Sequence, residues 1–288
     1  WPTATFTPFS VPARAYYEQG QAQQRAGDLD RALEAYTWAV QRDPTLAAAY
    51  VARGSVYLAR NELRQALADA STALAHDPDN AAALVLKGEA LRRLGRAQAA
   101  LSAFEQAVAL APSLKAETFQ SRWLAARAAH AEDALLALGR EYAARAPDDP
   151  LAPYYQGWAL IEAGRPISAT QVLVAGISRD PEGATALVWF TLGQAYLAAS
   201  AGGEAVTAFE AARRLVEEGD SSLALHSDQP LVDLFGMLGR AYIATGRCVD
   251  AETMLQYAVE IGGGAGDYAA FLEQARLCQT PTPRPTPY

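Results

Sequence analysis

The sequence predicts an all-α protein, an α-α superhelical solenoid of stacked helix pairs, from its composition and from an internal repeat. Alanine supplies about a fifth of the 288 residues, and 22 of the 24 basic residues are arginines, both strong helix formers. Four sets of residues recur at an interval of 34: Gly20, Gly54 and Gly88; Pro44, Pro78 and Pro112; Ala32, Ala66 and Ala100; Ala39, Ala73 and Ala107. A fixed period of this length indicates stacked repeats, each of which buries its apolar face only against its neighbours.

Each repeat reads as a helix, a tight turn and a second helix. Two stretches of about 14 residues with helical apolar spacing flank a polar turn at 27–28, 60–61 and 95–96. A proline then ends the second helix, because its ring and its missing N–H cannot continue it. Small residues at fixed positions let the helices approach closely while bulky ones fill the spaces between.

This pattern resembles the tetratricopeptide repeat family, which has bulky residues at positions 4, 11 and 24, small ones at 8, 20 and 27, and proline at 32. The second repeat carries it as Tyr50, Gly54, Tyr57, Ala66, Ala73 and Pro78. The resemblance implies seven repeats, over residues 13–46, 47–80, 81–114, 115–149, 150–183, 186–219 and 232–265. A capping helix over 266–279 follows, and Pro/Thr-rich segments 1–12 and 280–288 flank the solenoid.

The fourth repeat departs from the pattern. Arg122 stands where a small residue is expected, and Pro147 arrives one residue late, so we expect a one-residue insertion within 115–149. Two further insertions fall at 184–185 and 220–231. The second of these holds polar groups that could contact a ligand, although a long surface loop is the commoner outcome.

The two cysteines, Cys248 and Cys278, lie equally far on either side of the turn at 262–264. Residues equidistant from the turn of an antiparallel helix hairpin face each other, so we expect a disulfide that fastens the capping helix to the last repeat. For a loop of this size the bond would contribute about 3 to 4 kcal/mol. The alternative is a pair of buried free thiols.

The Thr/Pro-rich ends are typical of stalks on secreted proteins, and a plain linker is the alternative. The candidate O-glycosylation sites are Thr3, Thr5, Thr7, Thr280, Thr282 and Thr286. Together with a disulfide, such ends favour an extracellular or cell-surface location, with the periplasm as second choice. The chain starts at Trp1 and shows no signal-peptide pattern, so we expect a processed chain or a fragment.

Composition and motifs argue against several kinds of function. The net charge of -8 and the lack of any basic cluster disfavour nucleic acids and anionic membranes. His76, His130 and His226 lie in different repeats, and no metal, phosphate-loop or nucleophile motif is present. We therefore expect a protein that is not an enzyme and has no cofactor or metal.

The resemblance implies a binding groove lined by positions 2, 5, 9, 12 and 13 of each first helix. Positions 5 and 9 hold Tyr17 and Gln21, Val51 and Ser55, Val85 and Glu89, Phe119 and Trp123, Tyr154 and Trp158, Phe190 and Gln194, Gly236 and Arg240. The aromatic residues in repeats four to six predict a trough for an extended, Pro-rich peptide, edged by Arg92, Arg93 and Arg127. Alternatively some of these rings belong to the core, Trp123 in particular.

The leading hypothesis is an extracellular structural protein that self-assembles head to tail into a filament. In this hypothesis the Pro-rich tail of one copy docks on the next. The alternative is a monomeric surface or periplasmic scaffold that binds a different protein in the same groove.

Overall fold

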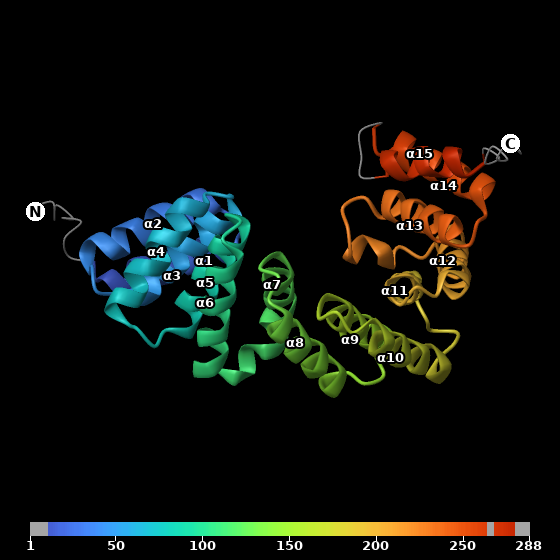
Figure 1. Cartoon of the computed structure of the whole chain (residues 1–288). Coiled ribbons are helices and arrows are strands. Elements are labelled where there is room, and N and C mark those ends of the chain that lie inside the picture. Colours follow the sequence, from blue (N-terminus) through green and yellow to red (C-terminus); the bar gives the residue numbers. More distant parts are fainter. Residues whose placement is uncertain (1–10, 264–267, 280–288) are drawn as a thin grey trace, which may run out of the picture. The chain divides into compact units, whose positions relative to one another are not determined.

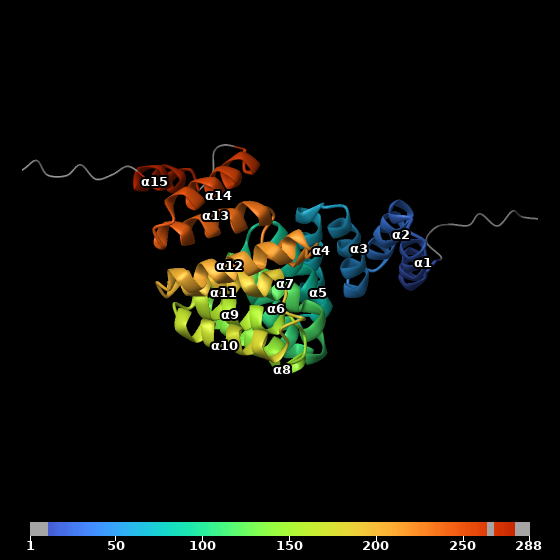
Figure 2. The same ribbon diagram turned by 90° about the vertical axis from the view of Figure 1, so that its right-hand side faces the viewer.

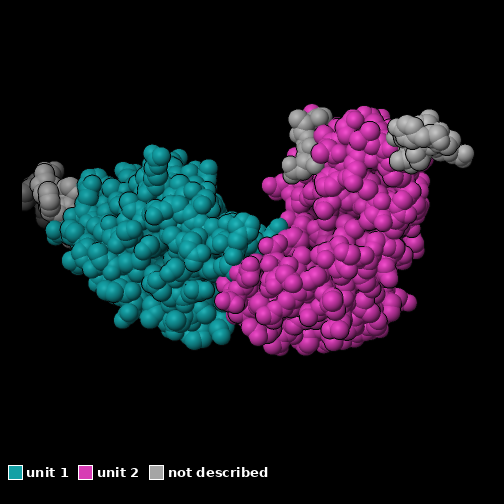
Figure 3. All heavy atoms as spheres, in the orientation of Figure 1, with its two compact units in different colours: residues 1–131 teal, residues 132–288 magenta. Residues whose placement is uncertain are grey.

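A computed structural model describes residues 11–263 and 268–279, and within them the chain forms fifteen α-helices and no strand. The predicted all-α solenoid is confirmed. The chain divides into two compact units, residues 1–131 and residues 132–288 (Figure 3). Each unit is described separately.

Unit 1 stacks seven α-helices in chain order, as Figure 1 shows in blue to green. Each packs against the helix before and the helix after it, and the first helices of successive repeats also contact one another. The helices are α1 (Ala13–Arg25), α2 (Leu29–Arg42), α3 (Ala47–Ala59), α4 (Leu63–His76), α5 (Ala81–Arg93), α6 (Ala97–Leu110) and α7 (Lys115–Ala128), with a 3₁₀ turn η2 (Pro112–Leu114) before α7.

Unit 2 repeats this arrangement with eight helices, and the turned view of Figure 2 shows α11 to α15 lying one beside the next. The first helices of its repeats also contact one another, α9 with α11 and α11 with α13, and α13 contacts the capping helix α15. The helices are α8 (Glu132–Arg145), α9 (Ala152–Glu162), α10 (Pro166–Arg179), α11 (Ala186–Ala198), α12 (Gly202–Glu217), α13 (Pro230–Ala244), α14 (Cys248–Ile261) and α15 (Ala269–Gln279), with a 3₁₀ turn η3 (Ser222–Leu225) between α12 and α13.

A residue with left-handed backbone closes the turn between the two helices of every repeat. These residues are Gly27, Asn61, Gly95, His130, Gly164, Ser200 and Gly246, with φ between 49° and 82°. Such a φ is costly for most side chains, so its recurrence identifies the same turn in every repeat. The turns of the first three repeats are 34 residues apart, and the fourth is one residue late, which locates its extra residue in α7 or the turn after it.

The glycine at position 8 packs against the bulky side chain 16 residues later in the same repeat. A Cβ atom built on Gly20 would lie 2.5 Å from the ring of Tyr36, and one on Gly88 would lie 2.8 Å from Phe104. Gly193 has the same relation to Phe209. Close packing requires glycine here, because a methyl group would overlap a fully buried ring.

In the second repeat the residue at position 24 is the small Ala70, so a different side chain packs against the glycine at position 8. There Gly54 faces Leu86 of the next repeat and Asp69. The Asp69 carboxylate accepts two hydrogen bonds from Arg53, at 2.8 and 2.7 Å, and is only 5% exposed. A buried ion pair therefore holds α3 to α4.

The boundary between the two units, after Ala131, falls inside the predicted fourth repeat. The first helix of that repeat, α7, lies in unit 1, and its second helix, α8, lies in unit 2. Arg122, which occupies the position expected for a small residue, is 9% exposed.

Candidate functional site: one groove in each unit

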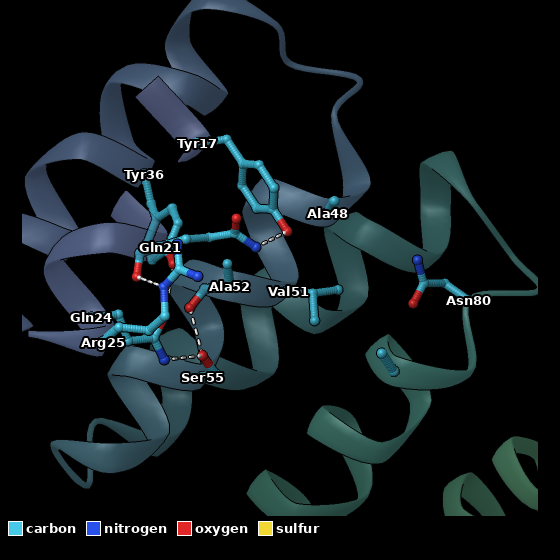
Figure 4. A pocket seen from close by; sticks show the side chains of 11 residues that line it. Tyr17, Gln21, Gln24, Arg25, Tyr36, Ala48, Val51, Ala52, Ser55 and Asn80 are labelled. Atoms are coloured by element: carbon cyan, nitrogen blue, oxygen red, sulfur yellow. Dashed lines mark hydrogen bonds between the residues drawn. The ribbon is translucent and has the colours of Figure 1, made fainter. Parts of the chain in front are cut away.

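Unit 1 contains a groove of about 510 Å³ between the first helices of its repeats, which we call groove 1 (Figure 4). The side chains come from α1, α2, α3 and the start of α5. They are Tyr17, Gln21, Gln24, Arg25, Tyr36, Ala48, Val51, Ala52, Ser55, Asn80 and Ala82. Four of them, Tyr17, Gln21, Val51 and Ser55, are residues that the sequence assigns to positions 5 and 9.

Hydrogen bonds fix the polar side chains of groove 1. Gln21 donates to the Tyr17 hydroxyl at 2.9 Å, and the Tyr36 hydroxyl donates to Gln24 at 2.7 Å (Figure 4). Gln24 in turn donates to the Ser55 hydroxyl at 3.3 Å. Burial raises the pKa of Tyr36 to about 12; nearby Tyr17 adds to this and Arg25 opposes it. The groove is therefore neutral and polar at pH 7 apart from Arg25.

Unit 2 contains a second groove of about 510 Å³, which we call groove 2. It lies beside the C-terminal ends of α9, α11 and α13, and α15 forms one wall. Its lining residues are Trp158, Ile161, Gln194, Leu197, Ala198, Met237, Arg240, Ile243, Ala244, Phe271 and Gln274. Trp158, Gln194 and Arg240 stand at position 9 of their repeats. Five more stand at positions 12 and 13, which the resemblance also assigns to the groove: Ile161, Leu197, Ala198, Ile243 and Ala244.

The wall of groove 2 formed by α15 is fastened covalently. Cys248 and Cys278 form a disulfide with their Cα atoms 5.8 Å apart. Gln279 donates to the carbonyl of Cys248 at 3.3 Å and to Glu252 at 2.8 Å. Hydrogen bonds from Gln279 and Arg276 lower the pKa of the Glu252 carboxyl. The capping helix is thus tied to the first half of α14.

Four aromatic residues assigned to a peptide trough are instead buried. Phe119, Trp123, Tyr154 and Phe190 are at most 3% exposed, so their rings belong to the core and the predicted open aromatic trough is wrong for them. Three of them stand at position 5 and Trp123 stands at position 9, and both positions point partly toward the neighbouring helices. Sequence spacing alone did not show how far the chain would cover it.

In unit 2 the inserted segment supplies part of that cover. The imidazole of His226 packs against the rings of Trp158, Phe190 and Tyr154, with centroids 4.5, 5.5 and 6.3 Å away. Leu223 in η3 is 3% exposed, so this segment is not only a surface loop as expected. The insertion therefore occupies the face of α9 and α11 that the sequence assigned to a ligand.

The same segment caps the start of α11. The Asp220 carboxylate accepts from the N–H of Ala186 at 2.7 Å, and the Ser222 hydroxyl accepts from the N–H of Leu187 at 3.0 Å. Burial acts to raise the pKa of Asp220, but the hydrogen bonds from Ala186 and Ser222 outweigh it and lower the pKa. The first N–H groups of a helix lack partners within it, and here the insertion satisfies two of them.

The three arginines predicted at the groove edge line neither groove 1 nor groove 2. Arg92 pairs with Glu89 at 2.8 Å, and Arg93 donates to the carbonyl of Leu58 at 3.2 Å. Arg127 is half-buried in the last turn of α7. Neither groove includes any of the three, and the candidate glycosylation sites lie outside the described residues.

The sequence also missed part of both grooves. Arg25 and Asn80 enter groove 1 from helix ends, and Phe271 enters groove 2 from the capping helix. Arg25 stands at position 13 of the first repeat, which the resemblance assigns to the groove, whereas Asn80 and Phe271 lie outside the assigned positions.

Two kinds of feature are absent from residues 11–263 and 268–279. No group of three or more His, Cys, Asp or Glu side chains is placed to hold a metal ion in this part of the chain. None of the helices described is long and apolar enough to cross a lipid bilayer.

Comparison with known proteins supports the repeat assignment. The tetratricopeptide repeat family matches residues 17–63 and 51–114, all in unit 1. No curated protein matches the chain. A tetratricopeptide repeat protein from Parabacteroides merdae matches with a TM-score of 0.59 and 16% identity, over 92% of this chain and 98% of that one. The TPR domain of Arabidopsis OM64 is 25% identical, with a TM-score of 0.36, over 37% of this chain and 88% of that one.

The Parabacteroides merdae structure shares only 16% of its sequence with this chain, so its TM-score of 0.59 establishes the fold and nothing more. Residues 17–114 are therefore identified as tetratricopeptide repeats, and the chain folds as a tetratricopeptide-type helical solenoid.

Proposed function

We propose that this protein is a non-enzymatic interaction scaffold that binds extended peptide segments of other proteins. The observation that carries the proposal is that each unit holds a groove of about 510 Å³ lined mainly by the first helices of consecutive repeats. A trough along several parallel helices contacts a peptide at regular intervals, which suits a segment without structure of its own.

The ionisable groups also favour binding over catalysis. Three pairs in which one pKa is shifted hold helices or turns together: Arg53 with Asp69, Tyr142 with Asp149, and Tyr242 with Glu210. None of these six residues lines groove 1 or groove 2, and Tyr36, which does line groove 1, has its pKa raised chiefly by burial. Such pairing is typical of structural networks as well as of active sites, and here the networks are separate from the grooves.

Peptide selection tests this function. A random dodecapeptide library is selected on the full chain and on variants that fill one groove, Val51→Arg for groove 1 and Leu197→Arg for groove 2. The matched controls place arginine on exposed helix surfaces outside the grooves, Leu110→Arg in unit 1 and Val174→Arg in unit 2. We expect selected peptides to lose binding to one of the groove variants and to keep it with both controls. If no peptide is enriched, or if the groove variants behave like the controls, the grooves do not bind peptides.

A second function, self-association head to tail, is favoured by an exposed apolar stripe on α14. Val249, Tyr257 and Ile261 are 67%, 50% and 53% exposed, at the C-terminal end of the described solenoid. Exposed apolar patches of this kind often mark contact surfaces. We propose that this stripe meets another copy, with the Pro-rich tail 280–288 docking on the neighbour as a further contact.

The oligomeric state tests self-association directly. Sedimentation over a wide concentration range is expected to show growing species for the full chain and smaller ones for Val249→Glu and for a chain lacking residues 280–288. A monomer at all concentrations would leave the scaffold that binds a different protein as the function. Polymers unchanged by the truncation would remove the tail from the proposal.

We also propose an extracellular or cell-surface location, with the periplasm as the alternative. The disulfide between Cys248 and Cys278 supports an oxidising compartment, and the Thr/Pro-rich ends suit a stalk. Mass spectrometry of protein from its native source is expected to find the cystine and sugar on Thr280, Thr282 or Thr286. Free thiols at both cysteines would contradict the location.

A further inference from the structure

Groove 2 contains one charged side chain, Arg240 on α13. Its guanidinium lies 4.7 Å from the centre of the Phe271 ring and donates to the sulfur of Met237 at 3.2 Å. Among the residues that the structure describes, no carboxylate pairs with it. A half-buried guanidinium against an apolar wall keeps its capacity for a bidentate bond to a carboxylate.

A second polar group in the groove lacks a donor. The Oε1 atom of Gln194 on α11 is buried and accepts no hydrogen bond from the described part of the protein. Buried acceptors of this kind are normally satisfied, and because the Gln194 side chain lines groove 2, a rotation of its amide toward the groove would let it accept an N–H from an occupant. The backbone of an extended peptide presents such donors at regular spacing.

The rest of the groove is suited to apolar side chains. Trp158, Leu197 and Ile243 line it from three different helices, and Gln274 is the only other polar side chain. An occupant therefore meets apolar surface on the helices and one cation at Arg240.

We propose that groove 2 binds an extended peptide segment of a partner protein in which an acidic residue lies beside apolar residues. The acidic carboxylate bonds to Arg240, a backbone N–H of the peptide donates to Gln194, and the apolar side chains contact Trp158 and Leu197. This inference rests on the proposed peptide-binding function and deepens it by naming the chemistry of the partner.

A structural role for Arg240 makes a different prediction. The arginine stacks on Phe271, so in a structural role it helps to hold the capping helix against α13. In that role its loss lowers stability and leaves peptide choice unchanged.

The test selects the random dodecapeptide library on the full chain and on Arg240→Gln. The matched control is Arg214→Gln, an exposed arginine on α12 outside the groove. We expect the unmodified chain and the control to enrich Asp or Glu flanked by apolar residues. Arg240→Gln is expected to lose the acidic preference and to bind a selected peptide about tenfold or more weakly, since charge-assisted hydrogen bonds are the strong ones.

A second variant keeps the test decisive if Arg240→Gln is poorly folded, which thermal unfolding followed by circular dichroism reveals. Gln194→Leu is expected to lower the affinity for the same peptide while leaving the preference for acidic residues intact. Unchanged affinity in this variant would remove Gln194 from the proposal.

The outcomes separate this inference from the general function. Neutral or basic consensus peptides, or an acidic preference that survives in Arg240→Gln, would overturn the inference. Peptides that lose binding only to Val51→Arg would do the same while leaving the scaffold function intact through groove 1. A library that yields no binder to either groove would contradict both.

Discussion

The two units differ in what covers the first helices of their repeats. In unit 1 the first three repeats follow one another at intervals of 34 residues. Hydrogen-bonded side chains, among them Tyr17, Gln21 and Gln24, line groove 1. In unit 2 the segment 220–231 interrupts the spacing and places His226 against Tyr154, Trp158 and Phe190. A strict period leaves the inner face open, whereas an insertion can fill it with the protein's own side chains.

The units also differ in how they are fastened. Unit 1 has a buried ion pair, Arg53 with Asp69, inside a repeat, and unit 2 has a disulfide that ties its last helix down. In repeat proteins each helix pair contacts only its neighbours, so these local devices act on local stability. The predictions below separate the contributions of the two units.

The largest expected effect is the loss of Arg53. Arg53→Met leaves the Asp69 carboxylate buried without its partner, which is expected to destabilise unit 1 by about 3 to 5 kcal/mol. Urea unfolding followed by circular dichroism measures it. The double variant Arg53→Met with Asp69→Leu is the control, and it is expected to recover much of the loss. A single variant no less stable than the double one would contradict the buried-pair account.

Removal of the disulfide is the matching change in unit 2. The double variant Cys248→Ser with Cys278→Ser is expected to cost about 3 to 4 kcal/mol by the loop-entropy relation, confined to the capping helix and its neighbour. Hydrogen exchange measured by mass spectrometry is expected to show faster exchange over 269–279 and no change in unit 1. Equal protection of 269–279 in both proteins would show that packing alone holds α15.

The repeat contact between a glycine and a buried ring is the same in the two units. Gly88→Ala in unit 1 and Gly193→Ala in unit 2 are each expected to cost about 1 to 3 kcal/mol, because the added methyl overlaps Phe104 or Phe209. The control is Gly203→Ala on α12, where the added atom meets nothing within 4 Å. Chemical denaturation compares the three. Gly203→Ala is expected to be neutral or slightly stabilising, because alanine is the better helix former. A cost at Gly203 equal to the others would contradict the overlap with a buried ring as the cause.

The smallest expected effect tests the insertion. Asp220→Asn is expected to weaken the cap on α11 by about 1 kcal/mol at neutral pH. The pKa of Asp220 is lowered in the folded state, so its stabilisation is present above the unfolded pKa of 3.8 and disappears as the pH falls through the folded value. Unfolding measured over a pH series is expected to show the two proteins converging in acid. A difference that stays constant with pH would exclude the carboxylate as its cause.

Much of the fold was predictable because it follows from spacing. The interval between Gly20, Gly54 and Gly88 reflects a closely packed glycine in each of the first three repeats. In the first and third repeats its neighbour is the ring 16 residues later, and in the second it is Leu86 of the next repeat. The predicted cap pairing of Cys248 with Cys278 also followed from their distances to one turn. Groove positions were predictable in part: Tyr17 and Trp158 line grooves, whereas Trp123 and Phe190 are buried.

The sequence by itself therefore determined the helices, their turns and the order in which they stack, because these depend on contacts between residues at fixed separations along the chain. Only the tertiary structure decided which inner-face side chains remain accessible. The position of His226 over Trp158 and of Phe271 beside Arg240 depends on how an irregular segment and a capping helix pack in space. No period in the sequence encodes such contacts, so grooves 1 and 2 appear only once the chain is folded.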